Sequence, residues 1–286
     1  LAQPCLPDPT QPVRHLAVAT SHPPFLLKRW IEAFGLDRAT AYARQGVRTP
    51  PVIVAVEEGF DQDSSAGPWH AHEQAGFIVW QGTHTELTAF LAGHVARRVQ
   101  DPASAQAVAL CRGLSIRTAL DYCAGRGTKT RQLALEHPQA RVWATDPHAD
   151  RRQHLEELAR ELPHVQAVSP QQALRQQVDL LLVDVPCSNT GVLARRPEAR
   201  YRLNRQSLDQ LLKLQRQILT QAARTVRPDG HILYSTCSIE AEENQHQARW
   251  LAQQVGGQIL REEQPFPDGQ GQRYHDGGYA ALIRRS

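Results

Sequence analysis

The sequence of 286 residues has no methionine, few aromatic residues and only five cysteines. No two cysteines form a Cys-x-x-Cys pair, which favours a reduced, cytoplasmic chain with free thiols over a disulfide scaffold. The 13 histidines show no spacing typical of metal ligands, and His70-Ala71-His72 is expected to lie in a solvated loop. We therefore predict no metal site.

Long apolar runs are also absent, and no signal peptide is recognisable, so we predict no membrane partner. Because the chain begins with Leu1 and lacks methionine, we expect that residue 1 is not an intact translated N-terminus. A content of 41% hydrophobic and 21% charged residues is ordinary for a globular protein, which we expect to be a monomer. The net charge is +3, and most of the positively charged residues are arginine. This balance is compatible with an RNA partner without being specific for one.

The chain divides into two parts of different pattern. Residues 1–105 start with an irregular proline-rich stretch and then predict a small α+β module. Its helices are expected at 25–35 and 37–45, the second capped by Asp37, and its strands at 51–56 and 76–80. In residues 106–286, strands alternate with helix-length segments, which predicts a parallel sheet with helices on both faces. The strands are expected at 117–122, 141–146, 164–168, 178–185, 231–236 and 279–283; the helices at 129–137, 149–162, 207–226 and 240–255; and a turn at 227–230.

A glycine turn follows the first of these strands, in residues 121–130 (D-Y-C-A-G-R-G-T-K-T). Gly125 and Gly127 carry no Cβ, so a ligand can approach the backbone closely at the carboxyl end of the strand. Asp146 ends the next strand and can accept both hydroxyls of an adenosine ribose. The pattern fits S-adenosylmethionine (SAM); a dinucleotide loop would need a third glycine where Thr130 stands, and the Gly-Lys-Ser/Thr ending of a P-loop is absent. A turn that serves packing alone remains the alternative.

Two cysteines follow apolar strand-like runs: Cys187 in residues 184–188 (D-V-P-C-S) and Cys237 in residues 234–238 (Y-S-T-C-S). Cytosine C5 is a poor nucleophile, but a thiolate that adds to C6 makes C5 enamine-like and able to take a methyl group. Asp184, three residues before Cys187, is placed to meet N3 of such a base. In the alternative interpretation each cysteine is a small buried hydrophobe, which is what we expect of Cys123, Cys5 and Cys111.

At this point the segments resemble a known family, the Sun-type (RsmB-like, NOP2/Sun) RNA cytosine-5 methyltransferases, which include bacterial small-subunit ribosomal RNA enzymes. Residues 184–191 (D-V-P-C-S-N-T-G) resemble the family's D-A-P-C-S-G-T-G. Residues 236–238 with 242–244 resemble its T-C-S…E-E-N, and residues 100–104 its Q-D-x-x-S. The similarity runs from about His15 to the end of the chain.

The resemblance implies a fold, a cofactor and a set of roles. The fold would be a class I methyltransferase (Rossmann-like) sheet of seven mostly parallel strands, preceded by an RNA-recognition-like module. The substrate would be RNA, ribosomal RNA in preference to transfer RNA. Cys237 would attack C6, Cys187 would assist product release, Asp184 would contact the base and Lys129 would lie in the active site. SAM would be bound by Cys123, Ala124, Gly125, Arg126, Gly127, Thr128, Lys129, Asp146 and Asp184.

Two stretches depart from the family pattern. The family's cofactor loop C-A-A-P-G-G-K-T is C-A-G-R-G-T-K-T here, in residues 123–130. The family's acidic residue after the third strand, near the adenine, is absent from residues 168–170 (V-S-P). Both departures bear on SAM binding.

A basic stretch follows Cys187, from which we expect Arg195, Arg196, Arg200 and Tyr201 to contact RNA by phosphate binding and stacking. A solvated basic face is the alternative. Two other functions also stay open. One is a class I methyltransferase acting on a substrate other than RNA. The other is an RNA-binding or assembly factor that has lost its SAM site.

Overall fold

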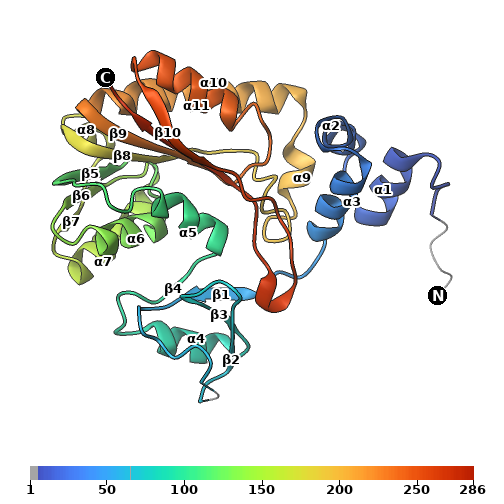
Figure 1. Ribbon diagram of the computed structural model, residues 1–286, viewed down its shortest axis with the longest axis horizontal. Coiled ribbons are helices and arrows are strands. Elements are labelled where there is room, and N and C mark those ends of the chain that lie inside the picture. Colours follow the sequence, from blue (N-terminus) through green and yellow to red (C-terminus); the bar gives the residue numbers. More distant parts are fainter. Residues whose placement is uncertain (1–5, 65) are drawn as a thin grey trace.

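A computed structural model describes residues 6–64 and 66–286 of the chain. It confirms the expected α/β class, with a seven-stranded, mostly parallel sheet and a smaller N-terminal α+β part. Figure 1 shows the large sheet with helices above and below it, the N-terminal strands at the bottom of the view and the first three helices at the right.

The large sheet is doubly wound. Its order is β10-β11-β9-β8-β5-β6-β7, and β11 is antiparallel to both of its neighbours, whereas the other pairs are parallel. The chain moves outward from β5 to β7 and then returns to β8 on the other side of β5. This reversal creates a switch point, where ligands bind beyond the carboxyl ends of the strands. The strands are β5 (Thr118–Asp121), β6 (Arg141–Ala144), β7 (Val165–Ala167), β8 (Val178–Asp184), β9 (Val226–Thr236), β10 (Gln258–Glu263) and β11 (Tyr279–Arg284).

Both faces of the sheet are covered, which explains why β8 is a continuous apolar run. Leu180 and Leu182 face the cluster that includes α5 to α7, while Leu181 and Val183 face the cluster that includes α10 and α11. Each of these four side chains is fully buried and stabilises the fold by roughly 1.5–3 kcal/mol. The helices are α5 (Pro102–Ala109), α6 (Thr128–Glu136), α7 (Ala149–Glu161), α8 (Pro170–Ala173), α10 (Arg205–Ala222) and α11 (Gln245–Gln254).

The N-terminal part contains a second, antiparallel sheet in the order β2-β3-β1-β4. Helix α4 (His84–Leu91) packs against it through Leu87 and Phe90 and begins with a capping box between Thr83 and Glu86. The strands are β1 (Val52–Ala55), β2 (Trp69–Ala71), β3 (Phe77–Trp80) and β4 (Arg98–Val99).

The first three helices pack away from this small sheet. Leu26, Leu27 and Trp30 lie in one buried cluster with Leu193 and Leu203 of the larger part, beside α9 (Ala199–Arg202). These helices are α1 (Pro12–Thr20), α2 (Pro24–Phe34) and α3 (Leu36–Gln45). The predicted boundary at residue 105 falls inside α5. The division into domains at 1–105 and 106–286 stays a prediction.

Some local predictions were wrong. Helix α3 begins at Leu36 with Gly35 in the capping position, so Asp37 lies in its first turn and does not cap it. The turn expected at 227–230 is a bulge within β9, where the register of β8 and β9 shifts and Asp229 has φ of 62°.

Two further expectations also need correction, and one falls outside the described residues. Helix α11 begins at Gln245, because residues 240–244 form a loop whose side chains are used elsewhere. His70-Ala71-His72 is not a solvated loop: two of its residues lie in β2, and buried His72 donates from Nε2 to the Tyr274 carbonyl at 2.9 Å. Cys5 lies outside the described residues. None of the helices in 6–64 and 66–286 combines the length and apolar character needed to cross a membrane.

Candidate active site

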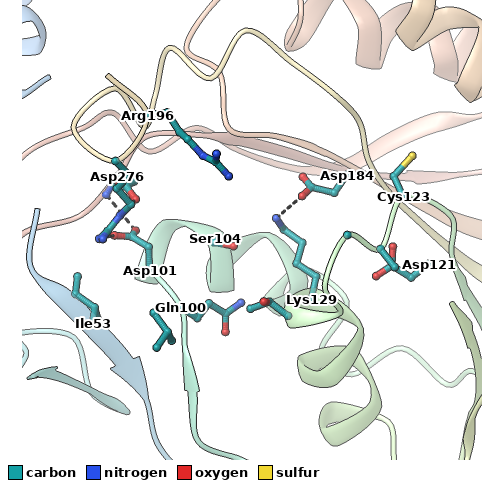
Figure 2. Close-up of a pocket in the computed structure, with 15 residues that line it drawn as sticks. Ile53, Gln100, Asp101, Ser104, Asp121, Cys123, Lys129, Asp184, Arg196 and Asp276 are labelled. Carbon is teal, nitrogen blue, oxygen red and sulfur yellow. Dashed lines mark hydrogen bonds and ion pairs between the residues drawn. The ribbon is translucent and has the colours of Figure 1, made fainter. Parts of the chain in front are cut away.

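The carboxyl ends of β5, β8 and β9 lie side by side at the switch point. Leu182 pairs with Asp121 on one side of β8, and Asp184 pairs with Ser235 on the other. A cavity of about 420 Å³ opens beyond these ends, between the two sheets. Figure 2 shows Asp121, Cys123, Lys129 and Asp184 on one side of this cavity, and residues from the N-terminal sheet and the loops on the other. Its lining is Ile53, Val99, Gln100, Asp101, Ser104, Asp121, Cys123, Ala124, Gly125, Thr128, Lys129, Asp184, Arg195, Arg196 and Asp276.

Lys129 and Asp184 form an ion pair in this cavity (Figure 2). Lys129 Nζ lies 2.7 Å from Asp184 Oδ2, and the Ser235 hydroxyl donates to Asp184 Oδ1 at 2.7 Å. Burial alone would lower the pKa of Lys129, but the attraction and hydrogen bond of Asp184 outweigh it, so the net pKa is raised. Two residues that were predicted separately from the sequence therefore form a pair, in which a carboxylate held from both sides lies beside a charged ammonium.

The two thiols of the predicted chemistry also meet at the strand ends. Cys187 Sγ and Cys237 Sγ lie 3.2 Å apart, and the Cys237 thiol donates to Asn189 Oδ1 at 3.2 Å. The hydrogen bond that Cys187 donates to Cys237, together with burial, raises the pKa of Cys187 well above its usual value. Cys237 is the less buried of the two and is close enough to Lys129 for their charges to interact. Cys187 is therefore a protonated thiol at neutral pH, and Cys237 is the more accessible sulfur of the two.

A buried carboxylate holds the two thiol loops together. Glu243 Oε1 accepts from Ser188 N at 2.9 Å and from Gln215 Nε2 at 2.9 Å. Its Oε2 accepts from the hydroxyls of Ser188 and Ser238, the latter at 2.6 Å. Each serine directly follows one of the two cysteines in the sequence, so Glu243 fixes the spacing of the thiols. Sequence reasoning noted this residue only as a motif letter, since its partners lie 28 and 55 residues away in the chain.

We expect Glu243→Ala to destabilise the protein by about 2–5 kcal/mol, because it leaves the Ser188 N–H and one of the two Gln215 N–H groups buried without an acceptor and opens a cavity. Glu243→Gln is the matched control. Its amide oxygen can serve the two N–H donors while its NH₂ faces the two hydroxyls, which can rotate to accept. Thermal unfolding of both variants measures the difference. Equal melting temperatures for the alanine and glutamine variants would contradict this role.

The glycine turn has one residue for packing and one that faces open space. Gly125 and Gly127 have φ of 57° and 87°, in the left-handed region that favours glycine. A Cβ on Gly127 would come within 3.0 Å of Leu155 and Leu158, whereas a Cβ on Gly125 would meet nothing within 4 Å. Gly127 therefore serves close packing, and Gly125 leaves the backbone open to a ligand.

Asp121 supplies an acceptor that the protein itself does not satisfy. Its Oδ2 accepts from the Thr130 hydroxyl at 2.7 Å, but its buried Oδ1 has no hydrogen-bond partner among the described residues. Burial raises the pKa of Asp121 to about 7. An unpaired carboxyl oxygen beside the glycine turn fits a ligand that carries an amino group, as the methionine end of SAM does. Sequence reasoning used Asp121 only to mark where the strand ends.

The remaining cofactor residues lie along the same edge. Asp146 is buried beyond β6, where its Oδ2 accepts from Gly125 N at 3.1 Å and its Oδ1 from His148 N at 3.0 Å. Its contact with a ribose stays a prediction. Burial raises the pKa of the Cys123 thiol far above its usual range, and Cys123 lines the cavity. Arg126 is exposed, and Ser169, at the position of the missing acid, caps α8 through a bond from Gln172 N.

The predicted RNA-contacting residues occupy different environments. Arg195 is bound into the cavity wall by Asp276 at 2.5 Å and Asp101 at 3.1 Å. Arg200 is only 4% exposed and donates to the carbonyls of Thr20 and Gly46, so it does not fit direct phosphate contact. Arg196 and Tyr201 are exposed, and for them RNA contact stays a prediction.

Comparison with known proteins decides the family. The sequence profile described as 16S rRNA methyltransferase RsmB/F matches residues 115–278, which include the glycine turn, the ion pair and both thiols. This chain belongs to the RsmB/F (NOP2/Sun) family of SAM-dependent RNA cytosine-5 methyltransferases. The probable ribosomal RNA small subunit methyltransferase B of Bacillus subtilis is 30% identical over 253 residues, covering 82% of this chain and 56% of that protein. This RsmB/F family member spans about half the length of the curated relatives it matches.

Solved structures share the fold of this RsmB/F chain. A methyltransferase homolog protein from Pyrococcus horikoshii has a TM-score of 0.75 at 19% identity, with 98% of this chain and 100% of that chain covered. The structure of NSun6 from Pyrococcus horikoshii with SFG has a TM-score of 0.66 at 15% identity, covering 93% and 99%. The fold therefore extends beyond the matched profile and includes most of the N-terminal part.

Proposed function

We propose that this protein transfers a methyl group from SAM to C5 of a cytosine in ribosomal RNA, through a covalent bond between Cys237 and C6. The observation that carries the proposal is the pair of thiols 3.2 Å apart, at the ends of β8 and β9, beside the Lys129–Asp184 ion pair. When bound at the glycine turn, SAM supplies an electrophilic methyl group.

The residues divide the chemistry between them. The target base leaves any helix to reach the strand ends. Cys237 gives up its thiol proton to solvent and its Sγ bonds to C6, while the electron pair of the C5–C6 double bond moves onto C5 and toward N3, which makes C5 a nucleophile. A proton shared between N3 and Asp184, which is held by Lys129 and Ser235, keeps the base in place and offsets the negative charge that moves toward N3. A base held in this orientation presents C6 to the sulfur and C5 to the open side of the glycine turn.

Product release requires that C5 lose its proton to a water molecule while the Cys237–C6 bond breaks. The C–H electron pair then restores the C5–C6 double bond, and the sulfur leaves as a thiolate. Cys187 remains protonated because its pKa is raised, and its S–H lies within reach of Cys237 Sγ. It can donate a hydrogen bond to the leaving sulfur, which lowers the cost of the charge that develops there.

The choice of ribosomal RNA is supported by the family description and by the curated relatives, which are described as ribosomal RNA small subunit methyltransferases. The need for two reduced thiols fits the cytoplasmic setting predicted from the cysteines. An RNA-binding factor without a SAM site is less well supported, because the open side of Gly125 and the unpaired Asp121 oxygen remain available to a ligand.

The proposal is tested with the purified chain, labelled SAM and small-subunit ribosomal RNA from a strain that lacks the protein. We expect the label to enter the RNA, and bisulfite sequencing to locate the new methyl group at one cytosine. Calorimetric binding of SAM without any labelling of RNA would favour a different substrate. Absence of both would overturn the proposal in favour of an assembly factor.

A further inference from the structure

A second cavity, of about 400 Å³, adjoins the thiols and has no role in the steps above. None of its lining residues lines the first cavity. One wall is the loop after β8, and the opposite wall is formed by α9 and the first half of α10. The lining consists of Cys187, Ser188, Asn189, Ala199, Arg202, Leu203, Ser207, Gln210, Leu211 and Leu214.

Asn189 connects this cavity with the nucleophile. It has φ of 61° and stands where the resembling family motif has glycine, so its side chain is a feature of this sequence. Its Nδ2 donates to the Cys187 carbonyl at 2.9 Å, and its Oδ1 accepts from the Cys237 thiol. A base bonded to Cys237 therefore lies one side chain away from the second cavity. The nucleotide next to it in the RNA chain can then reach the mouth of that cavity.

The lining has the composition of a site for a flat, partly polar ring. Leu203 is buried, Leu211 half-buried and Leu214 41% exposed, which gives an apolar surface for the face of a base. Gln210 is exposed, and its amide forms no hydrogen bond with the other described residues, so it can read the edge of a base.

Two exposed arginines lie close together in the chain beside this cavity, and Arg202 belongs to its lining. Arg202 and Arg205 each have side chains 74% exposed, and their ion pairs with Glu198 and Asp209 are long, at 3.8 and 3.6 Å. Exposed helix pairs of this kind contribute only about 0.3–0.5 kcal/mol and yield readily to a phosphate. An apolar cavity with cations at its rim suits a nucleotide better than an acidic peptide or a neutral apolar ligand.

We propose that this cavity binds the unpaired base of the nucleotide that adjoins the target cytosine in the RNA, with its phosphate between Arg202 and Arg205. The proposal rests on the proposed function, because it takes the target base to be at Cys237. It makes α10 a specificity element: the enzyme would methylate cytosine in a defined neighbourhood, chosen by the contacts of Gln210 and the leucines.

The test fills the cavity and leaves the catalytic groups unchanged. Leu214→Trp places an indole in it, while Gln217→Trp, at an exposed position of α10 outside the lining, is the matched control. With an RNA fragment that the wild type methylates, we expect the Leu214 variant to raise KM about tenfold and to leave kcat within twofold, since stacking of one base is worth about 1–3 kcal/mol. The control is expected to behave as wild type. Equal KM values for the two variants would overturn the proposal.

Two RNA probes separate this proposal from the proposed function. An abasic residue on one side of the target cytosine should lower wild-type kcat/KM about tenfold and have no further effect in the Leu214 variant. A 4-thiouridine at the same position should crosslink to residues 203–214 of the wild type only. Methylation without this crosslink, from either neighbouring position, would overturn the cavity site alone. The crosslink without methylation would overturn the proposed function and leave nucleotide binding in the cavity supported.

Discussion

Replacing Cys237 by alanine is expected to abolish RNA methylation, by roughly 10³-fold or more. Without a sulfur at C6, C5 keeps its low nucleophilicity, and no other described group is placed to attack. Cys187 lies 3.2 Å away but cannot take over, because its pKa is raised well above its usual value and it remains a buried thiol. The measurement is transfer of label from SAM to ribosomal RNA under single-turnover conditions.

Cys111→Ala is the control for Cys237→Ala. Cys111 is a fully buried thiol in the cluster between α5 and the large sheet and lines neither cavity, so its loss should leave the methylation rate within about twofold. Both variants should keep the wild-type far-UV circular dichroism spectrum. Methylation by the Cys237 variant at more than a few per cent of the wild-type rate would show that Cys237 is not the nucleophile.

Replacing Cys187 by alanine is expected to have a different result, the accumulation of a covalent protein–RNA complex. Cys237 can still attack C6, and the methyl group can still be transferred, because neither step uses Cys187. In this variant the Cys187 S–H donor, which lies 3.2 Å from Cys237 Sγ in the wild type, is missing. The leaving thiolate therefore develops its charge without that hydrogen bond when the Cys237–C6 bond breaks. A denaturing gel should show a band of protein plus RNA that forms only when SAM and RNA are both present.

The control for this trapped complex is the double variant that lacks both thiols, which should form no covalent band. Glu243→Gln offers a second control: it keeps both sulfurs and their spacing, so it should turn over without trapping. If the Cys187 variant released product at the wild-type rate, the donor in the release step would have to be another group, such as a water molecule.

The sequence was sufficient to predict where the chemistry lies along the chain. Apolar runs bounded by polar residues predict central parallel strands, and polar residues that follow two such runs must share one edge of the sheet. The sequence alone therefore predicts that Asp184, Cys187 and Cys237 lie together at this edge. Local errors arose where tertiary contacts override local signals: Asp37 looks like a cap, yet packing starts α3 one residue earlier, and the turn-like 227–230 is absorbed as a bulge in β9.

The tertiary structure alone decided which charged and polar groups are free to act. Arg200 has the same local context as Arg196, but it is buried and its two Nη atoms donate to carbonyls of residues 20 and 46, whereas Arg196 remains exposed. Glu243 becomes the link between the thiols only because the loops that follow β8 and β9 converge in the folded chain. Sequence patterns report the periodicity of a segment and the chemistry it carries. Whether a side chain is neutralised, buried or left without a partner depends on contacts between segments far apart in the chain, and these exist only once the fold is formed.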